Sequence, residues 1–244
     1  MNTTSTDTRI VAHLDILGMS TLVENNFTEA WGMLSDLVDV RDHVQVHEYE
    51  FVETSERLRV FERIKIITFS DTLLLFTVGA SDLELKSMII LVSEIFHKTL
   101  FKCVPVRAGI SVGEFWFNLY KAMYAGPALI EAYRTGEAAQ WLGIAFAESA
   151  QKMAAALNMQ STGSDVVVRW PVPVKNGERD GRVVNWPAIF AHDLEVKPPI
   201  SVNQFYAAFE RAFGSFEALP RDVQSKYENT VRFMNRQLEL HHEA

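Results

Sequence analysis

Hydrophobic residues in the first half of the chain follow two patterns, short continuous runs and longer segments with helical spacing. Ile10–Leu14 is a short apolar run of the kind that forms a buried strand. From Thr21 to Val46, and again from Leu83 to Lys102, apolar residues recur at three- and four-residue steps. Because this spacing places them on one side of a helix, both segments are predicted to be amphipathic helices.

The segment between the two predicted helices carries the clearest hairpin signal in the sequence. In "VFERIKIITFSDTLLLFTV" two runs typical of strands flank Ser70-Asp71, a pair suited to a tight turn. The charged stretch before it, "EYEFVETSERLRV", predicts a loop followed by a strand that begins near Leu58.

A strand and a long helix are predicted next. Val104–Phe117 has the pattern of a strand, and Ala128–Leu157 that of a long helix broken near Gly136 or Gly143. The order strand, helix, hairpin, helix, strand, helix is α+β rather than a repeated βα unit. It fits a ferredoxin-like βαββαβ sandwich, in which helices cover one face of a mostly antiparallel sheet.

Beyond residue 163 the pattern changes. The stretch "DVVVRWPVPVKNGERDGRVVNWP" predicts a β-hairpin, and "VNQFYAAFERAFGSFEAL" and "RDVQSKYENTVRFMNRQLEL" predict two closing helices. The sequence contains no internal repeat and no low-complexity linker. We therefore expect residues 1–160 to form a core, and residues 161–244 to complete the same domain as a C-terminal β-hairpin and helical extension.

Composition and charge exclude several classes of protein. The formal net charge is −8, which provides no basic surface for nucleic-acid binding. Cys103 is the only cysteine of the sequence, which excludes an internal disulfide and fits a reducing compartment. The polar start "MNTTSTDTR" does not resemble a signal peptide, and the apolar stretch "SMIILVSEIF" is too short to span a bilayer. We expect a cytoplasmic protein that does not bind membranes.

Two aspartates stand out because each follows an apolar run. Asp15 ends the first predicted strand, in "VAHLDILGMS", and Asp71 lies in the turn of the predicted hairpin. A ferredoxin-like sandwich makes these positions neighbours, and neighbouring carboxylates repel each other unless a cation lies between them. Mg²⁺ and Mn²⁺ bind oxygen ligands and use one or two carboxylates together with substrate phosphates. The alternative is that Asp71 is only a turn residue and Asp15 a helix cap.

Four segments resemble, in order, the motifs of the class III nucleotidyl cyclases. "LDILGMSTL" is similar to their Asp-Ile-x-Gly-Phe-Thr segment, with Met19 and Ser20 at the Phe-Thr positions. "KIITFSDTLLLF" resembles their Lys-Ile-x-x-x-Gly-Asp hairpin, with Ser70 in place of Gly. "VRAGISVGEF" is similar to their Gly-Ile-x-x-Gly-Glu strand, and "YAGPALIEAYRTGE" to their Gly-x-x-Val-Asn-x-Ala-x-Arg helix. The four motifs span roughly residues 9 to 150; none is specific alone, but their order is.

The resemblance implies an activity, metals and site residues. A homodimeric cyclase would hold two Mg²⁺ or Mn²⁺ ions with Asp15, Asp71 and the carbonyl of Ile16. Arg134 would reach across the dimer interface to the triphosphate, for which its planar, permanently charged side chain is suited. Lys65 lies where purine-using members place a base-reading lysine. From the residues alone, the alternatives are that Arg134 is a solvated arginine on a helix and that Lys65 is a lysine at the edge of a strand.

Departures from the purine-type pattern point to a smaller base. The polar partner of the base-reading lysine falls near Met123, and the ribose-positioning Asn falls at Ile130, whose side chain forms no hydrogen bonds. Unmet polar groups on a bound base give large discrimination, so adenine should be read poorly. These departures most resemble the pyrimidine cyclases of bacterial Pycsar anti-phage systems, which make cyclic UMP or cyclic CMP as a signal for a separate effector protein.

The resemblance therefore predicts a uridylate cyclase that converts UTP to 3′,5′-cyclic UMP and pyrophosphate in bacterial defence against phage. Tyr49, Arg63 and Tyr124 are candidates for lining the base pocket. Lys175 is a candidate for the second transition-state lysine of the family, and the alternative is a solvated turn residue. Other activities stay open: a cytidylate cyclase, a purine (adenylate or guanylate) cyclase, or a catalytically silent sensor with the cyclase fold.

Overall fold

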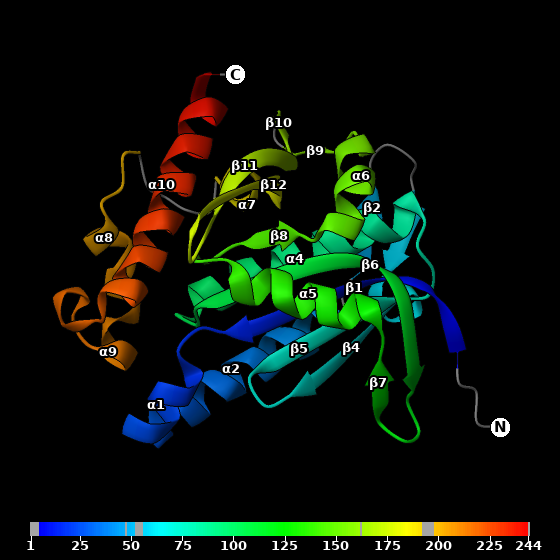
Figure 1. Cartoon of the computed structure of the whole chain (residues 1–244), viewed down its shortest axis with the longest axis horizontal. Helices are drawn as coiled ribbons and strands as arrows, with labels where there is room; N and C mark the ends of the chain where they lie inside the picture. The colour runs from blue at the N-terminus through cyan, green and yellow to red at the C-terminus, as the bar shows by residue number, and fades with distance from the viewer. Residues whose placement is uncertain (1–4, 47, 52–55, 162, 192–197, 244) are drawn as a thin grey trace.

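The structure is a computed structural model that describes residues 5–46, 48–51, 56–161, 163–191 and 198–243, of which 5–6, 48–51, 56–61 and 243 are described by their backbone alone. The strands of its main sheet are β1 (Ser5–Ile16), β4 (Ile64–Phe69), β5 (Thr72–Thr77), β6 (Val106–Asn118), β7 (Met123–Ala125), β8 (Ile144–Phe146), β11 (Val167–Val174) and β12 (Gly177–Val184). Their order is β11-β12-β8-β6-β1-β5-β4, and β7 pairs with the end of β6 (Figure 1).

The strands β6, β1, β5 and β4 confirm the predicted α+β, ferredoxin-like fold. Neighbouring strands in the order β6-β1-β5-β4 are all antiparallel, which is the strand order of a βαββαβ sandwich. The predicted hairpin is β4 and β5, and its turn is Ser70-Asp71, with Ser70 in the left-handed region at φ 53°. The turn therefore presents Asp71 at the end of the sheet where β1 also ends.

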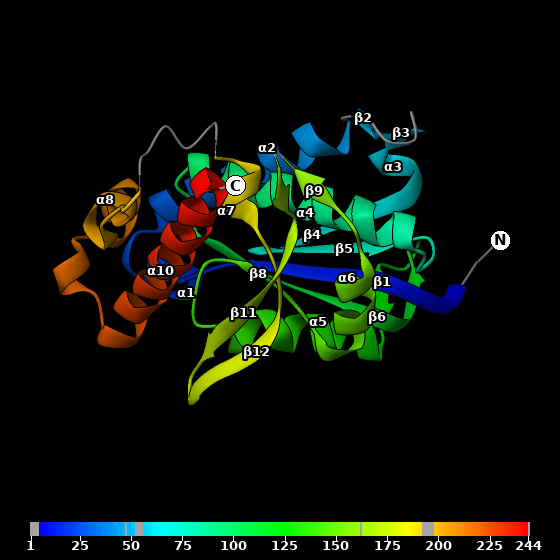
Figure 2. The same ribbon diagram turned by 90° about the horizontal axis from the view of Figure 1, so that it is seen from above.

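Helices cover both faces of this sheet, so the prediction that they cover only one face is wrong. The helices α2 (Phe27–Gln45) and α4 (Asp82–Phe101) pack over the main core on one face, and α5 (Pro127–Ala138) lies on the other face (Figure 2). The start of α4 is fixed by a capping box, in which the Ser81 hydroxyl and the Glu84 carboxylate each accept from the backbone N–H of the other residue.

The alternation of side chains along β1 distributes them between the two faces. Ile10 and Ala12 are buried in the main core, whereas Val11 is buried with Phe76 in a smaller cluster under α5. Successive side chains of a strand point to opposite faces. Asp15 therefore lies on the α5 side of the sheet.

The first predicted helix is wrong in one respect, because it is interrupted. Instead of one helix from Thr21 to Val46, the chain forms α1 (Met19–Asn25) and then α2. Asn26 separates them, and its side-chain oxygen accepts a hydrogen bond from the backbone N–H of Glu29 at 3.3 Å. An N-cap of this kind starts a new helix, and the apolar spacing on either side does not reveal the break.

The helix predicted over Ala128–Leu157 is broken, as predicted near Gly136 or Gly143, but its middle contains a strand that was not predicted. The chain forms α5, then β8, then α6 (Glu148–Ala156). The strand β8 is buried and pairs in parallel with β6, which is distant in the sequence. A short apolar run fits a buried helix as well as a buried strand, so periodicity could not distinguish them.

The charged stretch before the hairpin forms a separate two-stranded ribbon. Its strands are β2 (Glu48–Phe51) and β3 (Glu56–Arg59), and the short helix α3 (Val60–Arg63) connects it to β4. The strand predicted near Leu58 is thus part of β3.

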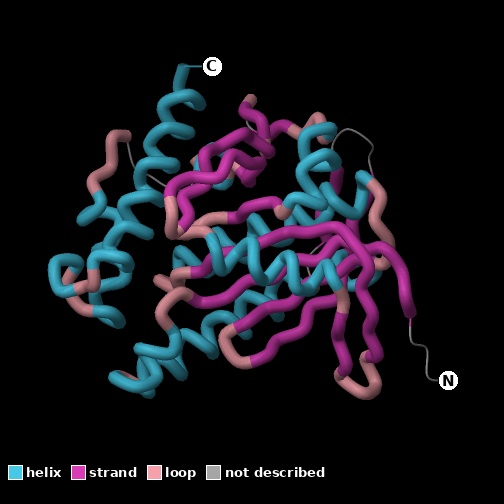
Figure 3. Tube along the Cα trace, viewed as in Figure 1, coloured by secondary structure: helices cyan, strands magenta, loops and turns pink. Residues whose placement is uncertain are grey.

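The C-terminal part extends the sheet and adds helices at one end of it (Figure 3). Its remaining elements are β9 (Gln160–Ser161), β10 (Ser164–Asp165), α7 (Trp186–Ile189), α8 (Val202–Tyr206), α9 (Glu210–Phe213) and α10 (Arg221–Glu243), with 3₁₀ turns at Ala207–Phe209 and Phe216–Ala218. The predicted hairpin is β11 and β12, and the second closing helix is α10; the first is divided into α8 and α9. The boundary at residue 160 stays a prediction.

The helix α10 packs on the sheet through an aromatic cluster. The ring of Phe233 lies 4.9 Å from that of Trp141 and 5.0 Å from that of Trp170, both in edge-to-face geometry. Within the part of the chain that the structure describes, no helix combines the length and the apolar character needed to cross a membrane.

Candidate active site

The ends of β1 and of the β4–β5 hairpin lie side by side. The backbone N–H of Ile16 donates to the carbonyl of Asp71 at 3.2 Å, and Asp15 is opposite Thr72 in the β1–β5 register. A cavity of about 350 Å³ opens there, and the residues that line it include His13, Asp15, Ile16, Asp71, Arg107, Tyr133 and Glu137. The structure thus brings together Asp15, Ile16 and Asp71, the three predicted metal ligands.

The alternative role for Asp15, that of a helix cap, does not fit its position. The N-cap of α1 is Gly18, in the left-handed region at φ 81°, and no side chain caps the helix. Asp71 does occupy the hairpin turn, as both of its interpretations require. The carboxylate of Asp15, which caps no helix, therefore needs a positively charged partner.

That charge comes in part from Arg107, which the sequence analysis did not single out. Arg107 is opposite Asp15 in the β1–β6 register, and its Nη2 lies 3.2 Å from Oδ2 of Asp15. The same Nη2 donates to Oε2 of Glu137 at 2.7 Å, and Nη1 donates to the Glu137 carbonyl at 3.1 Å. Glu137 belongs to the last turn of α5. Arg107 therefore connects the end of β1 to α5.

Burial and these contacts shift the pKa values of the cluster. Burial raises the pKa of Asp15 above its ordinary value, although the charge and hydrogen bonds of Arg107 act in the opposite direction. Burial alone would lower the pKa of Arg107, but Asp15 and Glu137 outweigh it and the pKa is raised. Burial also lowers the pKa of His13. The guanidinium of Arg107 therefore does not fully offset the burial of Asp15.

The donor set fits a hard divalent cation that takes its other ligands from a substrate. Two carboxylates and a backbone carbonyl are oxygen donors of the kind that Mg²⁺ and Mn²⁺ prefer. Among the described residues, no group of three or more His, Cys, Asp or Glu side chains can hold a metal ion by itself. Phosphate oxygens and water would have to complete the coordination, as is usual for magnesium.

The helix α5 places one side chain inside the cavity and another outside it. Tyr133 lines the cavity, and its ring meets that of His13 edge-to-face at a centroid distance of 5.2 Å. Arg134, the predicted catalytic residue, is exposed and does not line the cavity. Ile130 lies one turn earlier and is 51% exposed. The structure therefore does not bring Arg134 to the aspartates of its own chain.

The predicted base-reading residues gather around Phe76, on the α5 face. Lys65 is opposite Phe76 in the β4–β5 register, and paired residues share a face of a sheet. The ring of Tyr124 lies 6.3 Å from that of Phe76. Met123 is exposed on β7. Lys65 and Tyr124 thus each lie beside Phe76, on the α5 face of the sheet.

Three further candidates lie apart from this group. Arg63 ends α3 and has its Nη1 3.9 Å from Oε1 of Glu84. Lys175 is exposed in the turn between β11 and β12. The side chain of Tyr49 lies outside the described residues.

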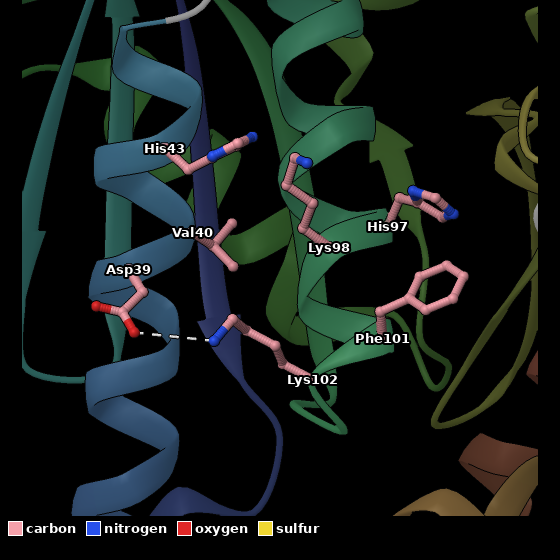
Figure 4. A pocket seen from close by; sticks show the side chains of 7 residues that line it. All are labelled: Asp39, Val40, His43, His97, Lys98, Phe101 and Lys102. Carbon is pink, nitrogen blue, oxygen red and sulfur yellow. Dashed lines mark ion pairs between the residues drawn. The ribbon is translucent and has the colours of Figure 1, made fainter.

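A larger cavity, of about 540 Å³, lies on the opposite face between α2 and α4 (Figure 4). Lys102, which lines this cavity, forms ion pairs with two aspartates of α2: its Nζ lies 3.8 Å from Oδ2 of Asp39 and 2.5 Å from Oδ1 of Asp36. None of the residues predicted from the sequence lines it. We assign the site to the smaller cavity because the three predicted metal ligands, Asp15, Ile16 and Asp71, line it.

Comparisons with known proteins agree with this fold. No protein-family model matches the chain, and no curated protein matches it. Among solved structures, the chain is similar to the catalytic core of a rhodopsin-guanylyl cyclase with converted specificity, in complex with ATPalphaS: the TM-score is 0.52 at 15% identity, over 74% of this chain and 97% of that one. It is also similar to a bacterial light-regulated adenylyl cyclase, with a TM-score of 0.49 at 13% identity, over 75% and 92%. The chain has the fold of a class III cyclase catalytic core.

Proposed function

We propose that the protein is a metal-dependent nucleotidyl cyclase, which converts a nucleoside triphosphate to a 3′,5′-cyclic nucleotide and pyrophosphate. The observation that carries the proposal is the meeting of Asp15 and Asp71 at one end of a cyclase-fold sheet. Both acids are parts of motifs that resemble the metal motifs of that family. A catalytically silent protein with the same fold would have no need of two neighbouring carboxylates at this end of the sheet.

In this proposal Asp15, Asp71 and the Ile16 carbonyl hold two Mg²⁺ or Mn²⁺ ions. When bound, the ions polarise the ribose 3′-oxygen and neutralise charge on the phosphates. The chain's own groups fix where this happens, because β1 and the hairpin hold the ligands on rigid elements. The oxygen of the ribose 3′-hydroxyl forms a bond to the α-phosphorus and its proton passes to solvent, while the bond between that phosphorus and pyrophosphate breaks. Asp15 is half-buried, and electrostatic stabilisation is stronger where water is excluded.

The position of Arg134 supports a homodimer with the sites at its interface. Arg134 is exposed and does not line the cavity of its own chain, so in this proposal a second copy supplies the arginine that stabilises the transition state. Large apolar side chains are exposed on α5 and on the β6–β7 hairpin that leads into it (Figure 1): Trp116, Leu119, Tyr120, Met123, Ile130 and Tyr133. Tyr120 is 90% exposed. Exposed apolar surface of this extent is typical of an association surface.

For the base we propose uracil, so that the reaction is UTP to cyclic UMP. Uracil presents two carbonyl acceptors, and Lys65, on the α5 face beside Phe76, is a donor suited to them. Cytosine would bring an amino donor towards the same cation. Ile130 gives no hydrogen bond where purine-type relatives use a polar side chain. The proposed role is a phage-defence signal that a separate effector protein reads.

A competition assay tests the activity and the base together. The purified protein is incubated with Mn²⁺ and equal concentrations of UTP, CTP, ATP and GTP, and the cyclic products are quantified by mass spectrometry. We expect cyclic UMP to exceed cyclic CMP by about tenfold, since one buried mismatch costs about 1–3 kcal/mol. Dominant cyclic CMP would refute the Lys65 reasoning, and dominant cyclic AMP or GMP the pyrimidine proposal. No product at all would leave a silent cyclase-fold sensor.

Two substitutions assign the activity to the site. Asp71→Asn should abolish turnover while the protein stays folded, because it removes metal-binding charge. Asp42→Asn makes the same chemical change at an exposed aspartate of α2 whose partner is Arg41, and should leave turnover unchanged. Substantial activity of Asp71→Asn in Mn²⁺-saturated buffer would exclude the two-metal site.

A further inference from the structure

Arg107 is a buried cation with two competing carboxylate partners. The residue is only 6% exposed, so the loss of a carboxylate partner would leave a buried charge uncompensated. Its Nε lies 3.3 Å and 3.4 Å from the two oxygens of Asp15, whereas its contact with the Glu137 carboxylate is 2.7 Å. The Glu137 carbonyl adds a further acceptor at 3.1 Å. Arg107 is thus anchored at Glu137 and reaches Asp15 over longer contacts.

The two carboxylates differ in what else can reach them. The Glu137 side chain is 49% exposed and belongs to α5, whereas the Asp15 side chain is 17% exposed and lines the same cavity as Asp71. Lys226 of α10 is close enough to feel the charges of both Arg107 and Glu137. Without Glu137, Arg107 would have Asp15 as its one carboxylate partner among the described residues, with a second cation nearby. The charge of Glu137 therefore determines how firmly Arg107 holds Asp15.

We propose that Arg107 is a positioning residue that serves as the internal counter-cation of the metal site, pairing with Asp15 before a metal ion binds and staying with Glu137 afterwards. The inference rests on the proposed metal site. It follows that Glu137 raises the affinity of Asp15 and Asp71 for the metal without binding the metal, because its ion pair with Arg107 keeps the guanidinium from competing for Asp15. It follows equally that Arg107 lowers this affinity, since two cations compete for one carboxylate.

Mn²⁺ binding to the purified full chain without nucleotide tests the signs of both effects. The free Mn²⁺ is measured by electron paramagnetic resonance during a titration. Glu137→Gln should weaken binding roughly tenfold, and Arg107→Met should tighten it several-fold. In the double variant the effect of Glu137→Gln should disappear, because no guanidinium remains to compete with Mn²⁺ for Asp15. Glu148→Gln, the same change at an exposed glutamate of α6, should leave binding as in the wild type.

Other outcomes would overturn the inference. If Glu137→Gln weakens binding equally with and without Arg107, Glu137 is itself a ligand; if Arg107→Met weakens binding, Arg107 is no competitor. Should Arg107→Met fail to fold, Arg107→Gln, which keeps hydrogen bonding to Glu137 but not the charge, is expected to show the same tightening. The proposed function fails separately: a wild type that binds no Mn²⁺, or an Asp71→Asn variant that binds it normally, removes the metal site and this inference with it.

Discussion

The contact between β6 and α5 depends on Gly109, and Gly109→Ala is the sharpest test of how the site is built. A Cβ atom at this position would lie 2.1 Å from the carbonyl oxygen of Ala132 and 2.7 Å from the backbone nitrogen of Gly136. Both are backbone atoms of the helix, so no side-chain rotation can relieve the overlap. Either α5 withdraws from the sheet or β6 bends.

The size of the effect follows from this distance. Restoring an ordinary van der Waals contact requires a shift of roughly 1 Å. Overpacking of this kind costs about 1–3 kcal/mol, which for a chain of this length lowers Tm by about 2–12 °C. Glu137 and Arg134 move with α5, and a misplacement of about 1 Å can cost roughly 100-fold in rate. Asp15 and Asp71 belong to β1 and the hairpin, so Mn²⁺ binding should change far less than turnover.

Gly113→Ala is the matched control on the same strand. A Cβ there would lie 3.5 Å from the Cβ of Ala128, an ordinary contact with the same helix. Tm is measured by circular dichroism and turnover by cyclic-nucleotide release. We expect wild-type values for Gly113→Ala and losses of both for Gly109→Ala. Wild-type Tm and turnover in Gly109→Ala would refute the close approach of α5.

Three further predictions concern the interface, alkaline pH and the start of α4. Mixing Asp71→Asn with Arg134→Ala should restore turnover well above either variant alone, because heterodimers contain one intact site; no recovery despite demonstrated subunit exchange would exclude a shared site. Burial raises the pKa of Tyr206 from 10.0 to about 12. On raising the pH, the unfolded state therefore loses the phenol proton before the folded state does, and the free energy of unfolding should fall between pH 10 and pH 12. Tyr206→Phe should flatten that fall in urea titrations. Ser81→Ala removes the capping box and should cost about 1 kcal/mol in the same assay.

The parts of the fold that the sequence predicted are those set by local patterns. The β4–β5 hairpin was found because the strand runs and the turn pair are adjacent. The strand β8 was missed because its identity depends on pairing with β6. Asn26 was missed because a cap interrupts a helix without changing its apolar spacing.

The candidate site shows the same division. Asp15 and Asp71 could be predicted as neighbours, because strand order alone brings their ends together. Arg107 and Glu137 stand in the motif segments, yet their contact depends on the β1–β6 register and on the rotation of α5. Register and helix rotation are set by packing over the whole sheet, and no spacing within one segment reveals them.

The alternation along β1 also explains why the proposed site is divided between two chains. The same period that buries Ile10 and Ala12 in the main core turns Asp15 towards α5, so the acids must lie beneath that helix. A helix that covers the acids with Tyr133 and Glu137 points the residue after Tyr133 elsewhere, since neighbouring helix positions face directions about 100° apart. Tyr133 and Glu137 therefore line the cavity, whereas Arg134 does not and is exposed. In the proposed homodimer the arginine at the phosphates comes from the second copy, and large apolar side chains, Ile130 and Tyr133, are exposed on the helix that carries Arg134.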